Sequence, residues 1–142
     1  MTIASILSGK GGDVATVAVG TSLRDAVAEL ARRRIGALPV TDGDSVVGIL
    51  SERDLVYRIA EHGPEVLDWP AERLMSSPAI TVEPSTPVLN ALSLMTRRRI
   101  RHLPVTESGR LSGIVSIGDL VKYRIEQIEA EAEAMLTYIQ QA

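Results

Sequence analysis

Two ten-residue stretches decide the fold of this chain: RRRIGALPVT at residues 32–41 and RRRIRHLPVT at residues 97–106. A shift of 65 residues places one on the other, and the register holds on both sides, so that residues 15–56 match residues 80–121. Each copy is one supersecondary unit that needs its neighbour to bury its apolar face. We therefore expect one domain with internal pseudo-twofold symmetry, and a ligand site in two versions in a cleft between the halves.

The composition fits this expectation. At 142 residues, with 45% apolar residues, only 3% aromatic residues and no Phe, the chain suits one domain with an aliphatic core. The absence of Cys excludes disulfides and thiolate chemistry, and the two histidines, His62 and His102, lie too far apart in the chain to indicate a zinc site. The net charge of −3 and pI near 5.4 argue against a nucleic-acid partner, and no apolar run reaches membrane-spanning length. We expect a cytoplasmic protein with neither a nucleic-acid nor a membrane partner.

Each copy predicts the element order β-α-β-β-α. In the first copy we expect strands over residues 15–19, 37–41 and 46–50, one helix capped by Thr21 or Ser22, and another from Ser51 to about Glu61. In the second copy we expect a strand over residues 79–82, a helix over residues 88–99, a hairpin around residues 107–109, and a helix from Ser116.

The predicted fold class is therefore α/β, with two tandem repeats packed with pseudo-twofold symmetry and an extended C-terminal helix. The expected organisation is a first repeat with the N-terminal segment over residues 1–63, a linker with one helical turn over residues 64–78, a second repeat over residues 79–124, and a helix extension over residues 125–142.

The candidate chemistry lies at the end of each hairpin. The first copy reads GILSERD and the second GIVSIGD, so each brings a serine (Ser51, Ser116) to a helix start with an aspartate three residues later (Asp54, Asp119). Free N–H groups at a helix N-terminus suit a phosphate, and an aspartate one turn on can accept hydrogen bonds from a ribose diol. Alternatively, S-x-x-D is a capping box that needs no ligand. Its recurrence in register favours the ligand site.

These motifs carry a family resemblance. The paired units, each with LPVT followed by GI(L/V)S-x-x-D, resemble a stand-alone bacterial pair of cystathionine-β-synthase (CBS) domains, also called a Bateman module. The resemblance implies adenosyl ligands in the central cleft: AMP or another adenine nucleotide, possible alternatives being NAD(H) and S-adenosylmethionine. It implies that the two aspartates bind ribose, that the two serines contact phosphate, and that backbone near Thr16-Val17 and Thr81-Val82 holds the adenine edge. It also implies a regulatory module that is not an enzyme and that acts on an unidentified partner protein.

The two copies differ where the family supplies basic side chains to phosphates. The second copy has Arg101-His102 at this position and the first has Gly36-Ala37, so we expect the second site to prefer AMP and the roomier first site to accept a dinucleotide. Arg53 or Lys10 is a possible substitute in the first site, although Lys10 is equally well interpreted as a solvated loop lysine. The full set of candidate nucleotide-binding residues is Lys10, Thr16, Val17, Gly36, Ala37, Ser51, Arg53, Asp54, Thr81, Val82, Arg99, Arg101, His102, Pro104, Ser116 and Asp119. We assign no catalytic or metal-binding residue.

The last helix is expected to run from Ser116 to about Gln140, well past its counterpart in the first copy. Its apolar residues recur at spacings of three and four: Ile125, Ile128, Ala132, Met135, Leu136 and Ile139. A second copy of the protein would bury this stripe and make a homodimer. The alternative is packing against the chain's own Ile3, Ile6 and Leu7. A structural or partner-binding dimer with vestigial pockets is the competing function, and no nucleophile–base pair supports an enzyme.

Overall fold

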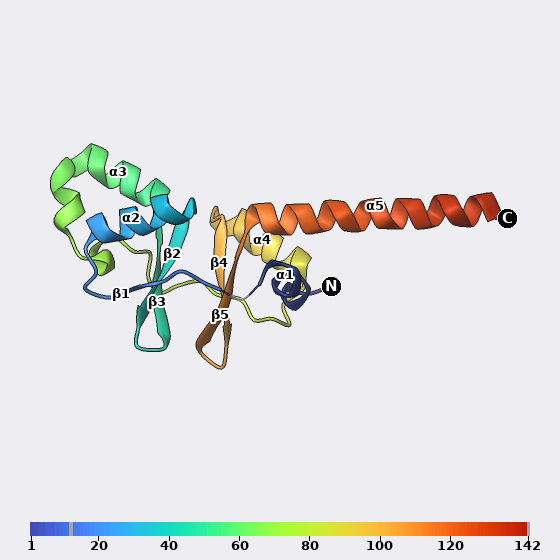
Figure 1. The fold of residues 1–142 in the computed structure, drawn as a ribbon, viewed down its shortest axis with the longest axis horizontal. Coiled ribbons are helices and arrows are strands. Elements are labelled where there is room, and N and C mark those ends of the chain that lie inside the picture. The colour runs from blue at the N-terminus through green and yellow to red at the C-terminus, as the bar shows by residue number, and fades with distance from the viewer. Residues whose placement is uncertain (12, 142) are drawn as a thin grey trace.

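The computed structural model describes residues 1–11 and 13–141. Two α/β halves lie side by side and share a five-stranded sheet in the order β1-β2-β3-β5-β4 (Figure 1). The first half contains β1 (Val17–Ala18), α2 (Leu23–Arg33), β2 (Ala37–Asp42), β3 (Ser45–Ser51) and α3 (Glu52–His62). The second half contains α4 (Val88–Arg98), β4 (His102–Glu107), β5 (Arg110–Ser116) and α5 (Ile117–Gln141). Outside the repeated elements lie α1 (Ile3–Lys10) and two 3₁₀ turns, η1 (Pro64–Asp68) and η2 (Ala71–Arg73). The α/β fold class with two repeats and a long C-terminal helix is confirmed.

The two hairpins have the same register. Pro39 is paired with Ile49 in the first and Pro104 with Ile114 in the second, and each hairpin has an irregularity after the valine of its LPVT sequence. The halves join where β3 and β5 run antiparallel, with Ser45 opposite Arg110. This edge-to-edge contact produces the pseudo-twofold relation that the repeat predicts.

The first strand of each repeat is shorter than predicted. β1 comprises two residues, and its counterpart in the second repeat is reduced to a single parallel bridge between Val82 and Val105, so the strand expected over residues 79–82 is wrong. Pro78 and Pro84 flank that segment, and proline has no N–H to donate to a strand neighbour. Ser22 is the residue that caps α2, since its Oγ accepts a hydrogen bond from the Asp25 N–H at 3.2 Å.

Each repeat has its own aliphatic core, and each core includes a segment from outside the repeat. Val66, Ala71 and Leu74 of the linker are buried in the first core. Ile3 and Ile6 of α1 are buried in the second core, so the N-terminal segment packs with the second repeat and not, as the expected organisation had it, with the first. The sequence analysis also did not predict α1 as a helix.

The N-terminal segment and the linker are structural counterparts. An antiparallel bridge joins Thr2 to Pro87, and an equivalent bridge joins Pro70 to Ser22. Five residues farther along, Leu7 lies over Gly113 of β5 just as Met75 lies over Gly48 of β3. Residues 2–7 therefore cover the second hairpin in the way that residues 70–75 cover the first, and the structural repeat is longer than the sequence repeat.

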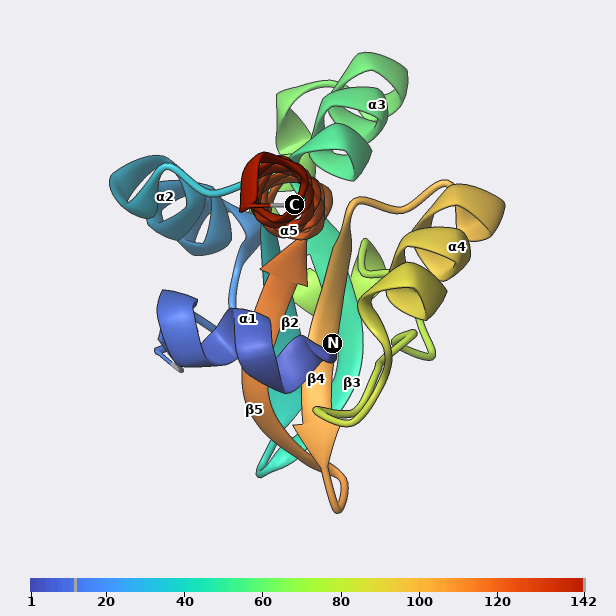
Figure 2. The same ribbon diagram turned by 90° about the vertical axis from the view of Figure 1, so that its right-hand side faces the viewer.

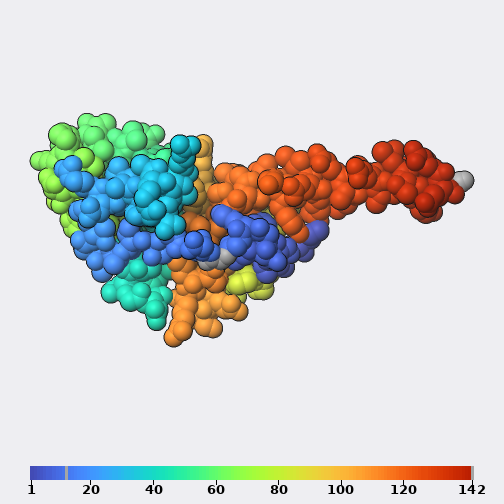
Figure 3. Space-filling view, viewed as in Figure 1, coloured from blue at the N-terminus to red at the C-terminus, as the bar shows by residue number. Residues whose placement is uncertain are grey.

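Most of α5 projects beyond the two halves as a single rod (Figures 1 and 3). Its predicted apolar residues Ile125, Ile128, Met135, Leu136 and Ile139 have exposed fractions between 48% and 61%. α1 lies against β5 and the start of α5 (Figure 2), where the Tyr123 hydroxyl approaches the Met1 sulfur at 2.8 Å. The N-terminal segment therefore does not cover the stripe, and packing against Ile3, Ile6 and Leu7 is wrong as an account of it. Within the described residues, no helix combines the length and apolarity that crossing a membrane requires.

We predict that Ile3→Ala lowers the free energy of unfolding by about 2–5 kcal/mol, because Ile3 is fully buried and its truncation leaves a cavity in the second core. Ser5→Ala, on the exposed side of the same helix, is the matched control and should change stability by less than about 0.5 kcal/mol. Urea unfolding monitored by circular dichroism measures both. Equal effects of the two substitutions would show that α1 is not docked in solution.

Candidate functional site

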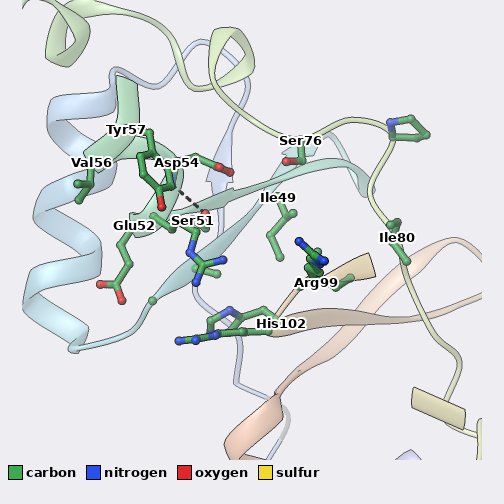
Figure 4. A pocket seen from close by; sticks show the side chains of 16 residues that line it. Ile49, Ser51, Glu52, Asp54, Val56, Tyr57, Ser76, Ile80, Arg99 and His102 are labelled. Atoms are coloured by element: carbon green, nitrogen blue, oxygen red, sulfur yellow. Dashed lines mark hydrogen bonds between the residues drawn. The ribbon is translucent and has the colours of Figure 1, made fainter. Parts of the chain in front are cut away.

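A cavity of about 510 Å³ lies between the two repeats (Figure 4). The first repeat contributes Gly36, Ala37, Ile49, Ser51, Glu52, Arg53, Asp54, Val56 and Tyr57; the segment before α4 contributes Ser76, Pro78 and Ile80; the second repeat contributes Arg99, Ile100, Arg101 and His102. Its volume falls within the range of small-molecule sites, about 300–1,000 Å³. The cavity combines an apolar wall with charged groups of both signs.

On the first-repeat side, the start of α3 presents the S-x-x-D motif. Ser51 is the N-cap of α3, and its Oγ accepts a hydrogen bond from the Asp54 N–H at 3.2 Å. The Asp54 side chain is half-buried, and its carboxylate makes no hydrogen bond or ion pair with any residue in 1–11 and 13–141. Both acceptor oxygens of Asp54 are therefore available to a ligand, beside the positive end of the α3 dipole.

On the second-repeat side, the turn from α4 to β4 presents Arg99, Arg101 and His102 to the cavity. Figure 4 shows Arg99 and His102 there. Arg99 ends α4 in the left-handed conformation, with φ of 54°, and so turns the chain toward β4. Arginine stays protonated at any physiological pH, so Arg99 and Arg101 are permanent cations at the cavity.

His102 differs from the two arginines in its charge. Burial and the nearby Lys10 ammonium lower the pKa of His102, although the carboxylates of Glu52 and Asp119 oppose this. In the ligand-free protein at neutral pH the imidazole is therefore a neutral hydrogen-bonding group, whereas the resemblance implies a basic phosphate ligand. Gly36 leaves the space that this ring uses, because a Cβ at Gly36 would lie 3.3 Å from His102 Cε1 and 3.2 Å from Glu52 Oε1.

The assignment of Arg101 and His102 to a site with Ser116 and Asp119 needs correction. The cavity that these two residues line contains the Ser51 and Asp54 of the other repeat. The reason is the antiparallel junction of β3 and β5, which turns the start of the middle strand of one repeat toward the other repeat. This cavity is thus built across the pseudo-twofold axis, which is a possibility that a sequence repeat leaves open.

The second S-x-x-D motif has different surroundings. The Ser116 Oγ accepts a hydrogen bond from the Asp119 N–H at 3.1 Å, and Asp119 Oδ2 accepts one from the Ser116 N–H at 2.8 Å, which completes a capping box. Lys10 Nζ donates to Asp119 Oδ2 at 2.6 Å and to the Ile114 carbonyl at 3.0 Å. Lys10 is therefore neither a free loop lysine nor, in this structure, a residue of the first cavity.

The pKa of Asp119 reflects this pairing. Partial burial raises the pKa of the carboxyl, but the hydrogen bonds from Lys10 and from the Ser116 N–H outweigh burial, so the pKa lies below its usual range. Asp119 is consequently ionised at any physiological pH, and Lys10 is its counter-ion.

The remaining predicted site residues do not line the cavity. Val17, Val82 and Pro104 are buried in the cores, and Thr16 and Thr81 adjoin the two valines. Half of the sixteen predicted residues line the cavity: Gly36, Ala37, Ser51, Arg53, Asp54, Arg99, Arg101 and His102. The sequence analysis missed Ile49, Glu52, Val56, Tyr57, Ser76, Pro78, Ile80 and Ile100. For Ile49 and Ile100 the signal was available, since both lie within the repeated stretches GILSERD and RRRIRHLPVT.

With this geometry established, comparison with known proteins identifies the family. The model of the CBS domain matches residues 10–61 and 71–126. The CBS domain-containing protein CBSX3, mitochondrial, of Arabidopsis thaliana is 32% identical over 148 residues, which cover 98% of this chain and 72% of that protein. The crystal structure of the CBS-domain containing protein ATU1752 from Agrobacterium tumefaciens superimposes with a TM-score of 0.84 and 38% identity, covering 87% of this chain and 99% of that chain.

A more distant structure shows the same fold. The CBS domain pair of protein MJ0100 superimposes with a TM-score of 0.79 at 23% identity, covering 89% of this chain and 98% of that chain. Together with the two repeats, the shared sheet and the motif at the start of α3, these matches show that the chain belongs to the CBS domain family and carries a pair of CBS repeats.

Proposed function

We propose that this protein is a regulatory module that binds an adenine nucleotide in the cavity between its repeats and thereby acts on a partner protein. AMP or another adenine nucleotide is the proposed ligand, with NAD(H) as a further candidate. The observation that carries the proposal is that the Asp54 carboxylate, unpaired among the described residues, and the α3 N-terminus meet Arg99 and Arg101 in one cavity of about 510 Å³. These groups match the ribose and the phosphate of a nucleotide.

Each part of a nucleotide has a matching group in this cavity. Asp54 accepts hydrogen bonds from the ribose diol, and Arg99 and Arg101 neutralise the phosphate, to which the Ser51 hydroxyl donates. Ile49 and Ile80 offer an apolar wall to the adenine ring. Because the arginines lie with Asp54, we now propose that AMP prefers the first site, the reverse of the preference expected from the sequence.

Ligands of a related fold support the adenosyl part of this proposal. The CBS domain pair of protein MJ0100 was solved in complex with 5′-methylthioadenosine and S-adenosyl-L-methionine. Both compounds carry adenine on a ribose ring with a free 2′,3′-diol, as AMP, ADP, ATP and NAD(H) do. The phosphate part of the proposal rests on Arg99 and Arg101 of this chain.

Regulation follows from the composition of the cavity wall. The wall draws residues from both repeats and from the segment between them, so a bound nucleotide contacts all three parts at once. A ligand that binds one arrangement of the halves better than another shifts the population toward it. A partner that recognises the favoured arrangement then responds to nucleotide concentration, without any chemistry at the site.

The exposed stripe of α5 supports a homodimer. Val121, Ile125, Ile128, Ala132, Met135 and Ile139 alternate at spacings of four and three, which is the seam of a two-stranded coiled coil. We propose that two copies of α5 pair in parallel along this seam. The parallel pairing places Arg124 of each copy opposite Glu129 of the other, so the flanking charges are complementary.

We predict that Asp54→Asn and Arg101→Ala each weaken AMP binding about tenfold or more, because each removes a hydrogen bond to a charged group worth about 1.5–3 kcal/mol. Arg97→Ala, which removes an arginine outside the cavity from the same RRRI stretch, is the control and should leave the affinity unchanged. Isothermal titration calorimetry measures all three. Wild-type affinity in both cavity variants would show that AMP does not bind in this cavity, and absence of AMP binding by the wild type would favour the structural dimer with vestigial pockets.

A second prediction concerns the dimer. Truncation after Tyr123, or the pair Ile128→Glu and Met135→Glu, should convert the dimer to a monomer, because each change removes apolar surface from the seam or places charge within it. The control is the pair Glu126→Gln and Glu133→Gln, which changes the same helix off the seam. Sedimentation equilibrium reports the mass, and a truncated protein that remains dimeric would exclude α5 as the contact.

A further inference from the structure

The two S-x-x-D motifs are alike in sequence but differ in what their aspartates contact. Asp54 lines the cavity, and its carboxylate is unpaired among the described residues. Asp119 Oδ2, in contrast, already accepts hydrogen bonds from Lys10 Nζ at 2.6 Å and from the Ser116 N–H at 2.8 Å. A ribose diol that is to bind Asp119 must therefore compete with an ammonium group of the protein itself.

The position of Lys10 follows from the structural equivalence of α1 and the linker. After Met75, the linker forms an isolated antiparallel bridge, in which Ser76 exchanges two backbone hydrogen bonds with Ile49, at 2.9 and 3.1 Å. After Leu7, the counterpart of Met75, the chain instead stays helical as far as Lys10. The Lys10 ammonium then hydrogen-bonds the carbonyl of Ile114, the counterpart of Ile49, at 3.0 Å. The Lys10 side chain thus takes the place of the backbone contact that Ser76 makes with Ile49, and it extends to Asp119.

Lys10 is held in place by a docked helix. Ile3 and Ile6 are buried in the second core, and the backbone N–H groups of Ile3 and Ala4 donate to the carbonyls of Thr86 and Pro84, each at 2.9 Å. The ion pair itself is partly accessible to solvent, with side-chain exposures of 38% for Lys10 and 27% for Asp119. An ion pair of this exposure contributes little to folding, so it can open without unfolding the protein.

We propose that Lys10 is a built-in occupant of the second site, which keeps a nucleotide out of that site until Lys10 releases Asp119. The proposal rests on the proposed nucleotide-binding function. In this proposal the two sites differ in their availability to a nucleotide. The first cavity is open to the nucleotide, and the second site becomes available only when Lys10 is displaced.

The ion pair also lies close to the first cavity. His102 lines that cavity, and the groups that face it are Lys10 from α1, Glu52 from α3, Asp119 from α5 and the adjacent Arg101. The Lys10 charge lowers the pKa of His102, and the carboxylates of Glu52 and Asp119 raise it. Removal of the Lys10 charge therefore raises the pKa of His102. The imidazole therefore reports the state of Lys10 in the absence of any nucleotide.

The test compares the full-length chain with Lys10→Met, Lys10→Arg and the double variant Lys10→Met with Asp119→Asn. Calorimetry with AMP should give one site per wild-type chain and per Lys10→Arg chain. Lys10→Met should bind a second AMP, with a gain of about tenfold or more in affinity at the second site, because a charged competitor for the carboxylate is gone. The double variant should lose this gain, because the carboxylate is gone as well.

A readout without ligand separates this proposal from the proposed function. NMR titration of His102 in the free protein should show a higher pKa in Lys10→Met than in wild type, and little change in Lys10→Arg. If no variant binds AMP but His102 shifts as expected, the nucleotide-binding function fails and the Lys10–Asp119 pair stands. If wild type binds two AMP equally, or if Lys10→Met changes neither stoichiometry nor the pKa of His102, the role of Lys10 is overturned.

Discussion

The close approach of a covering segment to a glycine in each hairpin is the constraint on which the rest of the structure depends. A Cβ at Gly48 would lie 2.5 Å from the Met75 sulfur and 2.8 Å from the Ser76 carbonyl, and a Cβ at Gly113 would lie 2.7 Å from Leu7 Cδ2. A larger residue at Gly48 would force the Met75 side chain and the Ser76 backbone to shift, and one at Gly113 would force the Leu7 side chain to shift. The glycines let residues 70–75 and 2–7 complete the two cores, and a repeat of this type lacks a closed core without them.

The covering segments also explain why two similar repeats produce two different sites. The paired motifs differ little between the copies, whereas the segments share little beyond their buried apolar positions, with IASIL at residues 3–7 and AERLM at residues 71–75. The linker pairs with its hairpin through the backbone of Ser76 and contributes Ser76, Pro78 and Ile80 to the cavity wall. The N-terminal segment stays helical and brings an ammonium group to Asp119. In the proposal above, ligand access is therefore decided by parts of the chain that lie outside the sequence repeat.

The same difference between the repeated motifs and the covering segments determines which parts of the structure could be predicted from the sequence. Both hairpins, the helices on either side of them and the serine caps of α2 and α3 follow from periodicity and turn residues, and all of them are present, whereas the first strand of the second repeat is reduced to a single bridge. α1 could not be found in this way, because an eight-residue helix that is held by burial of Ile3 and Ile6 has little local signal of its own. Nor does self-similarity say whether a site combines groups of one repeat or of both. That depends on the junction of β3 with β5, which rests on the pairing of Ser45 with Arg110.

The basic groups near the pseudo-twofold axis differ in their charge. Arg99 and Arg101 bring permanent positive charges to the first cavity, whereas His102 is kept neutral by burial and by Lys10. A negative charge in the cavity favours the imidazolium form of His102 and so raises its pKa. Loss of the Lys10 charge acts in the same direction. Both events therefore act on one imidazole, and by thermodynamic linkage any effect of Lys10 release on phosphate binding is matched by an equal effect of phosphate binding on Lys10 release.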